Sequence, residues 1–195
     1  MFSIDWDKRF PDISWRMDIS KITTADIIRR FGRPDVVWAS PDCTTYSVLA
    51  ISHHRRKGEH GELLPRTDYA KFCDDLNIHL HKLIRELRPK YWFIENPRGG
   101  MRKMPFMEGL PRYTVTYCQY GDFRMKPTDI WTNHPAPAFR APCKNGAPCH
   151  ESCRRHNHQG TLRLANSAER SRIPAALCEH IVDICEAGAK EENVT

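Results

Sequence analysis

Two short runs of apolar residues stand out in the pattern of hydrophobic and polar positions along the chain. Residues 36–39 (Val-Val-Trp-Ala) predict a buried strand, because β-branched and aromatic side chains without an internal breaker favour one, and Pro41 ends it. Residues 91–94 (Tyr-Trp-Phe-Ile) predict a second buried strand, after which a carboxylate, a proline and two glycines break the pattern. Residues 1–7 predict a further short strand.

Two further segments, one before the first apolar run and one between the two runs, have the patterns of helices. Residues 23–32 predict a short helix with a threonine cap, a terminal glycine and a proline shortly after it. A stripe of aromatic and aliphatic residues between residues 67 and 88 predicts a longer helix whose apolar face packs on a sheet. The alternation of strand, helix and strand predicts the α/β class with a mostly parallel sheet.

The pattern changes after Gly100. Residues 101–110 predict a short irregular helix. Residues 112–120 and 128–133 alternate and are rich in β-formers, which predicts two strands joined by a turn. A last amphipathic helix is expected near the end of the chain, where we expect Gly188 to stop it.

These elements predict one main domain with a small insert, since a chain of 195 residues suits a single core. We expect residues 1–133 to form the sheet domain and residues 134–161 to form a small insert rich in cysteine and histidine. Residues 162–188 are expected to return to the sheet domain as a helix, and residues 189–195 to form a disordered tail.

The composition is not that of a membrane protein, and the charge favours a polyanionic partner. Apolar residues make up 40% of the chain, and no apolar run approaches the ~20 residues of a membrane span. The formal net charge is +6, which suits binding to a nucleic acid. Eight cysteines occur without an export signal, so we expect thiols or metal ligands in a cytoplasmic protein rather than disulfides.

Basic residues concentrate in residues 47–65, a segment without periodicity. It contains Arg55 and Arg56 together with three histidines and two glycines. We expect a mobile loop over the nucleic-acid face, in which these two arginines contact phosphates. A solvated linker without a specific role explains the same composition equally well.

Each of the two predicted strands delivers a reactive side chain to the same edge of the sheet. Cys43 follows the first strand among hydroxyl side chains, and Glu95 follows the second strand directly. Catalytic groups gather at the carboxyl ends of strands in an open α/β sheet, where a thiol can be exposed and activated. Such a pair suits chemistry on a pyrimidine, in which the thiolate adds to C6 while the acid hydrogen-bonds to or protonates N3. The alternative for Cys43 is a buried structural cysteine.

The residues around these two side chains resemble motifs of the DNA cytosine-C5 methyltransferases. Residues 41–43 (Pro-Asp-Cys) resemble the Pro-Pro-Cys loop of that family, and residues 95–97 (Glu-Asn-Pro) resemble its Glu-Asn-Val/Pro motif. Each follows a strand, in the family's order. The resemblance implies a class I methyltransferase (Rossmann-like) fold, S-adenosyl-L-methionine as cofactor and double-stranded DNA as substrate. It points to phage or bacterial enzymes of the restriction-modification kind.

The resemblance also implies a mechanism. Cys43 would attack C6 of a cytosine that is flipped out of the duplex, Glu95 would assist at N3, and C5 would take the methyl group. Arg124 and Lys126 fall where the family has a hairpin of basic side chains that reach the DNA backbone and the flipped base. We therefore expect Arg124 at the catalytic site, and Lys126 and Arg98 in contact with DNA.

Candidate cofactor residues follow from the same resemblance. Asp5 resembles the acidic residue that binds the ribose of the cofactor, and Trp6 resembles the neighbouring side chain that packs on the adenine. Asp18 and Ile19 resemble an Asp-Ile pair that contacts the adenine amino group, and Pro41 is expected beside the cofactor. Without the resemblance, Asp5 suits an ordinary turn and Trp6 suits a core.

The first strand and glycine-rich loop of the family have no counterpart in this sequence. Met1 falls where the second strand of the family begins, and no glycine precedes Gly32. We therefore expect an N-terminally truncated chain, or a cofactor site that a second chain or a missing N-terminal segment completes.

Cysteines and histidines cluster in the proposed insert. Cys143, Cys149 and Cys153, with His156 or His150 as the fourth ligand, form a set that tetrahedral zinc prefers. The segment is polar and proline-rich, so a bound zinc ion would supply order that a small apolar core cannot. The alternative is a set of reduced thiols in a flexible loop.

Two other functions remain open at this stage. The chain could be a catalytically inactive DNA-binding remnant or accessory subunit, because the glycine-rich loop is absent. It could also be a different pyrimidine-modifying enzyme that uses the same pair, Cys43 and Glu95.

Overall fold

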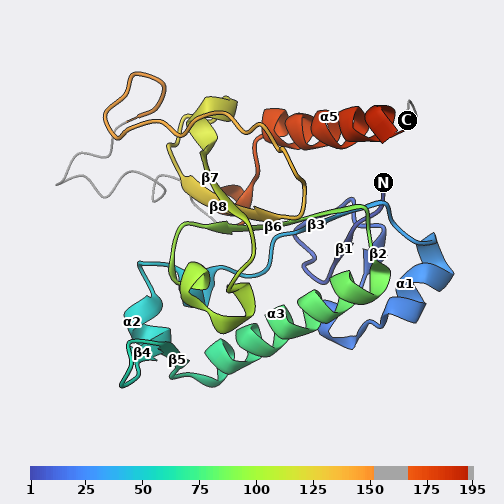
Figure 1. The fold of residues 1–195 in the computed structure, drawn as a ribbon. Helices are drawn as coiled ribbons and strands as arrows, with labels where there is room; N and C mark the ends of the chain where they lie inside the picture. Colours follow the sequence, from blue (N-terminus) through green and yellow to red (C-terminus); the bar gives the residue numbers. More distant parts are fainter. Residues whose placement is uncertain (152–166, 193–195) are drawn as a thin grey trace. The chain divides into compact units, whose positions relative to one another are not determined.

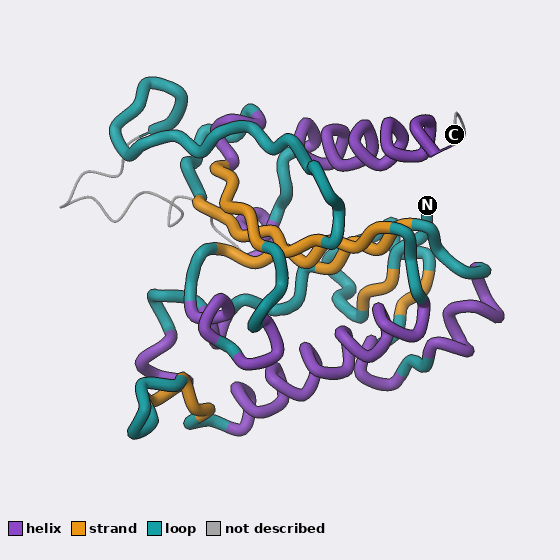
Figure 2. Tube along the Cα trace, in the orientation of Figure 1, coloured by secondary structure: helices purple, strands orange, loops and turns teal. Residues whose placement is uncertain are grey.

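The computed structural model describes residues 1–151 and 167–192. The chain forms two compact units, Met1–Leu110 (unit 1) and Pro111–Thr195 (unit 2). Helices and strands alternate along unit 1, and an antiparallel strand pair opens unit 2 (Figures 1 and 2). The α/β class expected from the sequence is therefore confirmed.

Unit 1 contains the two predicted strands as a parallel pair. Most of β6 is buried, but β3 is only partly buried and its Val36 is exposed, so the expectation of burial is wrong for the first strand. Strand β3 (Val36–Ala39) lies beside β6 (Tyr91–Pro97), with Val36 opposite Tyr91 and Ala39 opposite Ile94. Both strands point the same way, so the segments that follow them leave from one edge of the pair. The predicted reactive residues, Cys43 and Glu95, come after Ala39 and Ile94 at this edge.

Two helices of unit 1 follow the predicted capping pattern. In α1 (Thr24–Phe31), Thr23 and Asp26 form a reciprocal capping box, and Gly32 ends the helix with a φ of 80°. Helix α3 (Asp68–Leu87) begins after Thr67, whose side chain accepts a hydrogen bond from the Ala70 amide. Figure 1 shows α3 extending from the β4–β5 hairpin at one end of unit 1 to α1 at the other.

The carboxyl-terminal half of α3 helps to form an apolar cluster in unit 1. Ile22 and Ile27 are buried there against Leu83 and Leu87 of α3, and Val37 of β3 packs on the group. Burying each of these side chains contributes about 1.5–3 kcal/mol to stability. This cluster anchors the short strands β1 (Ile4–Asp5) and β2 (Trp15–Arg16), which pair in parallel, and the 3₁₀ helix η1 (Ile19–Lys21).

The segment 47–65 is more regular than the sequence indicated. After the 3₁₀ helix η2 (Thr44–Tyr46) it forms helix α2 (Ile51–His54) and an antiparallel hairpin, β4 (Arg55–Lys57) with β5 (Leu63–Pro65). The expected mobile loop therefore contains a helix and a hairpin, and the prediction of a loop without regular elements is wrong. Strands of three residues are too short to produce a readable alternation, and the hairpin depends on tertiary contacts of Arg55 described below.

The pattern between residues 100 and 132 agrees with the prediction except at residues 117–120, which were expected to continue a strand and form a 3₁₀ helix instead. Two 3₁₀ turns, η3 (Gly100–Lys103) and η4 (Pro105–Met107), complete unit 1 as the expected irregular helix. In unit 2, β7 (Arg112–Thr116) pairs antiparallel with β8 (Pro127–Thr132). The 3₁₀ helix η5 (Tyr117–Tyr120) follows β7 directly.

Unit 2 ends with two helices, α4 (Ser167–Ser171) and α5 (Ala175–Glu192). Helix α5 passes through Gly188, so the predicted stop at that glycine and the disordered tail over residues 189–192 are wrong. One glycine costs a helix only about 1 kcal/mol, which the rest of an 18-residue helix offsets. None of the helices in the described residues has the length and apolar character needed to span a membrane.

Candidate active site

Cys43 lies just beyond the carboxyl end of β3. It precedes η2, and its carbonyl accepts hydrogen bonds from the amides of Tyr46 (3.1 Å) and Ser47 (2.9 Å). The cysteine is partly exposed. The strand, the turn and the short helix thus present this thiol at an edge of unit 1 rather than inside a strand, as the sequence predicted.

The residue before the cysteine shapes this turn. Asp42 accepts a hydrogen bond from the Thr44 amide (2.6 Å) through Oδ1 and one from the Tyr69 hydroxyl (3.0 Å) through Oδ2. Burial, together with the nearby Asp42 carboxylate, raises the pKa of Tyr69, so its hydroxyl remains a donor at neutral pH. Asp42 stands where the family motif has a second proline, and its side chain fixes the backbone by hydrogen bonding instead.

Glu95 lies within β6, directly after the residue that pairs with the end of β3. It is 5% exposed, and Asn96 beside it is 1% exposed. The Asn96 side-chain amide donates a hydrogen bond to the Pro41 carbonyl (3.0 Å). This bond ties the segment that carries Glu95 to the segment that carries Cys43.

A close backbone approach links the same two segments a second time. A β-carbon on Gly99 would lie 2.5 Å from the carbonyl oxygen of Tyr46, and one on Gly100 would lie 3.2 Å from the same oxygen. A side chain at residue 99 would overlap the Tyr46 backbone, which explains that glycine, and a side chain at residue 100 would be crowded. The Cys43 turn and the loop after Glu95 are therefore packed backbone to backbone.

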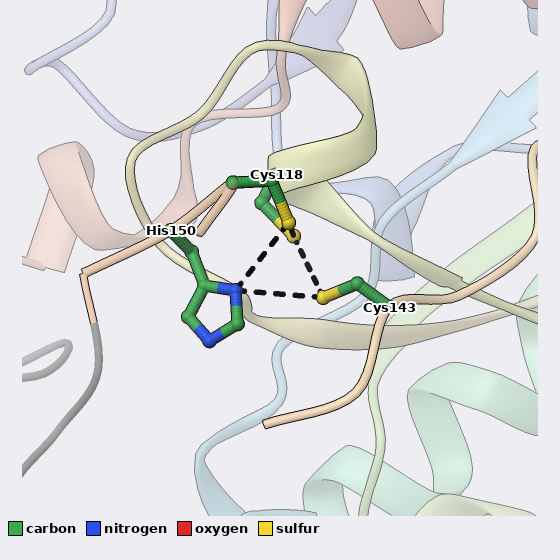
Figure 3. Close-up of side chains that lie close together, drawn as sticks. Cys118, Cys143 and His150 are labelled. Carbon is green, nitrogen blue, oxygen red and sulfur yellow. Dashed lines mark hydrogen bonds between the residues drawn. The ribbon is translucent and has the colours of Figure 1, made fainter. Parts of the chain in front are cut away.

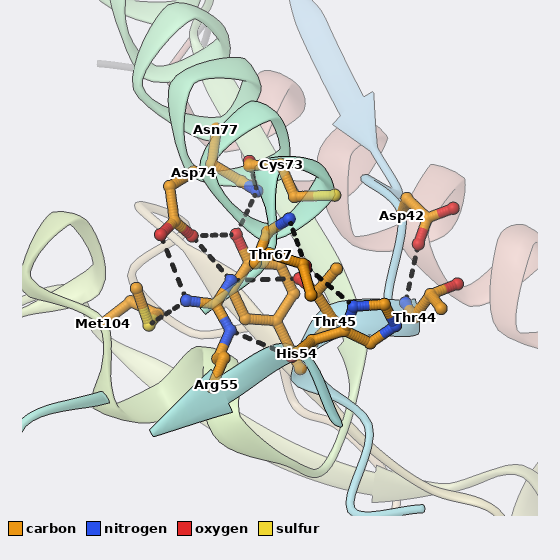
Figure 4. A network of polar contacts seen from close by, with 12 residues as sticks. Asp42, Thr44, Thr45, His54, Arg55, Thr67, Cys73, Asp74, Asn77 and Met104 are labelled. Atoms are coloured by element: carbon orange, nitrogen blue, oxygen red, sulfur yellow. Dashed lines mark hydrogen bonds and ion pairs between the residues drawn. The ribbon is translucent and has the colours of Figure 1, made fainter. Parts of the chain in front are cut away.

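A buried ion pair supports the Cys43 turn from behind (Figure 4). Arg55 of the β4–β5 hairpin contacts Asp74 of α3 at 2.7 and 3.1 Å, and its side chain is 0% exposed. The same guanidinium donates to the Thr45 carbonyl (2.9 Å) and to the Thr45 hydroxyl (3.0 Å). Arg55 was expected to contact nucleic acid, but in this position it is a buried structural residue that holds Thr45.

The neighbouring Tyr46 belongs to the same network. Its hydroxyl donates to Asp74 (2.7 Å) and accepts from the Asn77 side-chain amide (3.1 Å). The Arg55 guanidinium lies 4.2 Å from the centre of the Tyr46 ring, within cation–π range. Burial and the hydrogen bond to Asp74 raise the pKa of Tyr46, which keeps this hydroxyl protonated. The side chains of Arg55, Asp74 and Asn77 thus fix Thr45 and Tyr46, the two residues that follow Cys43 and Thr44.

Four of the five residues predicted for cofactor binding lie at the β1–β2 pair or beside it, whereas Pro41 lies in the turn after β3. Asp5 is partly exposed, and its Oδ1 accepts from the Asp7 amide (2.7 Å). The Trp6 side chain is 71% exposed, so it is not a core residue. Asp18 accepts bonds from the hydroxyl and the amide of Ser20, which lower the pKa of its carboxyl group. Ile19, in contrast, packs on the apolar cluster of unit 1.

Of the other residues predicted to contact nucleic acid, some have exposed side chains and others bind groups within the protein. Arg56 and Arg98 are exposed in unit 1. Arg124 of unit 2 is 7% exposed, forms a short ion pair with Asp122 and donates to the Arg170 carbonyl (3.2 Å). Burial of Asp122 acts to raise the pKa of its carboxyl group, but the hydrogen bonds from Arg124 outweigh burial and lower this pKa below its usual range.

Lys126 makes contacts of the same kind. Its ammonium group donates to the Arg170 carbonyl (2.9 Å) and lies 4.5 Å from the centre of the Tyr117 ring. Arg124 and Lys126 therefore hold the turn before β8 to the end of α4 in this arrangement. A role in contacting DNA would require both side chains to exchange these partners.

A second cluster of reactive side chains occurs in unit 2 (Figure 3). Cys143, Cys149 and His150 come together as predicted, but their neighbour is Cys118 of η5. Cys153 and His156, the other predicted metal ligands, lie outside the described residues. Cys118 was missed because it sits in a β-rich segment 25 residues before Cys143, and only the fold brings the two thiols within 3.0 Å.

Burial and close thiol neighbours shift the pKa values in this cluster in opposite directions. Desolvation and the hydrogen bond to Cys143 raise the pKa of Cys118 to about 12. Desolvation acts against ionisation of Cys143 as well, but hydrogen bonds from Cys118 and Thr116 lower its pKa. Cys143 is thus the thiol of this pair that ionises first.

Comparison with known proteins identifies the family. A curated relative described as a "Probable DNA (cytosine-5)-methyltransferase" of Frog virus 3 (isolate Goorha) is 30% identical over 167 residues. The match covers 77% of this chain and 75% of the viral protein. No family model matches the chain.

Two solved structures are also similar. The S. pombe Dnmt2 methyltransferase has a TM-score of 0.45 and 13% identity, and the match covers 67% of this chain and 40% of that one. A putative DNA modification methyltransferase encoded within an E. coli prophage has a TM-score of 0.47 and 16% identity, with 67% and 38% coverage. The relationship rests on the viral relative, whose identity and coverage show that this chain belongs to the DNA (cytosine-5)-methyltransferase family.

Proposed function

We propose that the protein methylates C5 of cytosine in double-stranded DNA, with Cys43 as the nucleophile and S-adenosyl-L-methionine as the methyl donor. Family membership supports the reaction class. The observation that carries the assignment of residues is the double connection between the two active segments. The Asn96 amide binds the Pro41 carbonyl, and Gly99 packs on the Tyr46 backbone, so Cys43 and Glu95 belong to one framework.

The thiol and the carboxyl group have complementary tasks in this reaction. The Cys43 thiolate forms a bond to C6 of the ring, and the electrons of the C5–C6 double bond move toward C5. Glu95 hydrogen-bonds to or protonates N3, which accommodates the negative charge that the ring gains. After C5 has accepted the methyl group, loss of the C5 proton and departure of the Cys43 sulfur restore the double bond and the free thiolate.

Burial of the carboxyl group limits how the substrate can reach it. Glu95 is 5% exposed and lies within β6, so a cytosine that remains stacked in a duplex could not contact it. The target base would therefore leave the helix and enter the edge of unit 1. The exposed guanidinium of Arg98, three residues after Glu95, is suited to hold a phosphate beside the flipped nucleotide.

The residues proposed for the methyl donor fit its adenosine half. The partly exposed Asp5 carboxylate suits the ribose hydroxyl groups, and the exposed Trp6 indole beside it suits the adenine ring. S-adenosyl-L-methionine supplies an electrophilic methyl group on a sulfonium centre. Asp5 and Trp6 would orient the adenosine end, while the segment from Pro41 to Cys43 would face the transferred group.

Covalent trapping tests the proposal. In the presence of S-adenosyl-L-methionine, DNA that carries 5-fluorocytosine at the target position should be methylated at C5 and then have no C5 proton to lose, so the wild-type protein should stay attached to it in a form stable to denaturant. Cys43→Ser should form no adduct and transfer no methyl group, while its affinity for DNA stays close to that of wild type. The matched control is Cys178→Ser, since Cys178 is an exposed thiol on α5. Methyl transfer by Cys43→Ser would refute the proposed mechanism.

A further inference from the structure

Four metal-binding side chains meet in unit 2, where the proposed reaction uses none of them. Cys118 comes from η5, directly after β7, and Cys143, Cys149 and His150 come from the loop that follows β8. One potential ligand atom from each residue lies within 4.8 Å of the other three. Figure 3 shows the Cys118 and Cys143 sulfurs and a ring nitrogen of His150 facing one another.

Three of the separations between the donor atoms match those of a tetrahedral zinc site. With Zn–S of about 2.3 Å and Zn–N of about 2.0 Å, tetrahedral angles place sulfurs about 3.8 Å apart, and sulfur and nitrogen about 3.5 Å apart. Cys149 Sγ lies 3.7 Å from Cys118 Sγ, and His150 Nδ1 lies 3.5 Å from Cys143 Sγ and 3.6 Å from Cys149 Sγ. Cys118 and Cys143 are closer, at 3.0 Å, and would separate slightly around an ion.

The donor atoms select among metals. Three thiols and one imidazole form a Cys₃His set, which favours Zn²⁺ and excludes Mg²⁺ and Ca²⁺, since those ions prefer oxygen ligands. Four protein ligands leave no open position for water or substrate, so the site would be structural rather than catalytic. Ionised thiols would bind the ion, and each binding event would release protons.

Neighbouring polar groups already orient the ligands. The Cys143 amide donates to the Thr116 hydroxyl (3.0 Å), and the Gln119 side-chain amide donates to Cys149 Sγ (3.3 Å). Such outer contacts fix ligand positions in metal sites. Coordination through His150 Nδ1 would place the ring proton on Nε2, so the long contact from the Gly146 amide (3.4 Å) to Nε2 would be lost on binding.

We propose that Cys118, Cys143, Cys149 and His150 bind one structural Zn²⁺ ion. The ion joins η5, which follows β7, to the loop that contains residues 143–150. The next residue, Glu151, donates its amide to the Phe123 carbonyl (2.9 Å), beside Arg124. The zinc site therefore holds this loop against the turn that carries the basic side chains before β8.

Metal content and cobalt spectroscopy test the ligand set without any assay of methyl transfer. The full chain, purified under reducing conditions, should contain one zinc ion per molecule. Replacement by Co²⁺ should give the thiolate charge-transfer and visible bands of a tetrahedral site. Removing an outer contact in known sites costs about 10–100-fold in affinity, so Cys118→Ser and Cys149→Ser should weaken binding more than about 100-fold.

Matched variants separate this site from its alternatives. Cys149 is exposed, so Cys149→Ser removes a ligand without opening the core, whereas Cys178→Ser removes an exposed thiol elsewhere and should leave zinc content unchanged. Cys153→Ser should also leave the cobalt spectrum unchanged. Absence of bound zinc in the wild type, or binding that depends on Cys153 and not on Cys118, would overturn the assignment.

Limited proteolysis supplies a structural readout. Lys144 lies inside the loop between two proposed ligands, and trypsin cuts after exposed lysines in unconstrained segments. Cleavage after Lys144 should appear only when a chelator removes the zinc, and added zinc should restore protection. Equal cleavage with and without chelator would show that no ion holds the loop.

Discussion

The ion pair behind the Cys43 turn gives the sharpest test of the framework. Asp74→Asn keeps the shape of the side chain and an acceptor for the Tyr46 hydroxyl, but it removes the charge that faces Arg55. The Arg55 side chain is 0% exposed and that of Asp74 is 15% exposed. The substitution therefore leaves a buried guanidinium without its counter-charge.

The structure sets the size of the effect. Removing one partner of a buried ion pair costs about 3–5 kcal/mol, and two charges 4 Å apart at an effective dielectric constant of about 20 attract by about 4 kcal/mol. Because water reaches Asp74, we expect the lower end, about 3 kcal/mol. In the double variant Arg55→Met/Asp74→Asn, no buried charge of this pair remains. The decrease in its free energy of unfolding should therefore be about 2 kcal/mol smaller than the sum of the decreases in the two single variants.

Urea unfolding followed by tryptophan fluorescence measures these values in unit 1. Four of the five tryptophans belong to unit 1, so the signal reports mainly on that unit. With a slope of about 2 kcal/mol per molar urea, a loss of 3 kcal/mol lowers the midpoint by about 1.5 M. As a control, Lys71→Gln in an exposed helix pair should leave the midpoint unchanged.

Two outcomes would refute the reasoning. A loss below about 1 kcal/mol for Asp74→Asn would mean that the Arg55 charge is solvated rather than buried. If the decrease in the free energy of unfolding of the double variant equals the sum of the two single decreases to within about 0.5 kcal/mol, the two residues act independently.

Two further predictions concern the turn after Glu95 and an acidic side chain of unit 2. Gly99→Ala would place a β-carbon 2.5 Å from the Tyr46 carbonyl, so we expect kcat to fall at least about 10-fold while DNA affinity is retained; an unchanged kcat would contradict the close packing. Burial acts to raise the pKa of Asp122, but its bonds to Arg124 outweigh burial and lower that pKa in the folded chain. Asp122 therefore stabilises the fold above its unfolded pKa, and this contribution is lost as pH falls through the folded pKa. Asp122→Asn should therefore flatten the loss of stability in acid, measured as urea midpoint against pH, and equal slopes for both proteins would exclude the effect.

Local patterns explain why much of the fold was predictable. The apolar residues 36–39 and 91–94 each predict a strand, and Thr23 and Thr67 each predict the start of a helix. Each of these elements can therefore be predicted from residues that are adjacent in the sequence. Cys43 and Glu95 were found because they end such elements.

Other features depend on residues far apart in the sequence. Arg55 stands in a basic run that reads as a solvent-exposed surface, and only Asp74, nineteen positions later, makes its burial favourable. Cys118 has no cysteine or histidine at zinc-ligand spacing, and its neighbours appear only when the loop after β8 folds back. Such pairings carry no local periodicity, so the sequence pattern could not reveal them.

The parallel pairing of β3 and β6 also sets the order in which the active segments can assemble during synthesis. The Pro41 carbonyl and the Asn96 amide that binds it are 55 residues apart. At roughly 5–20 residues per second, the ribosome takes about 3–11 s to make the intervening chain. During that interval Cys43 is an unpositioned thiol on a nascent chain, and it gains its proposed catalytic setting only when β6 emerges and binds alongside β3.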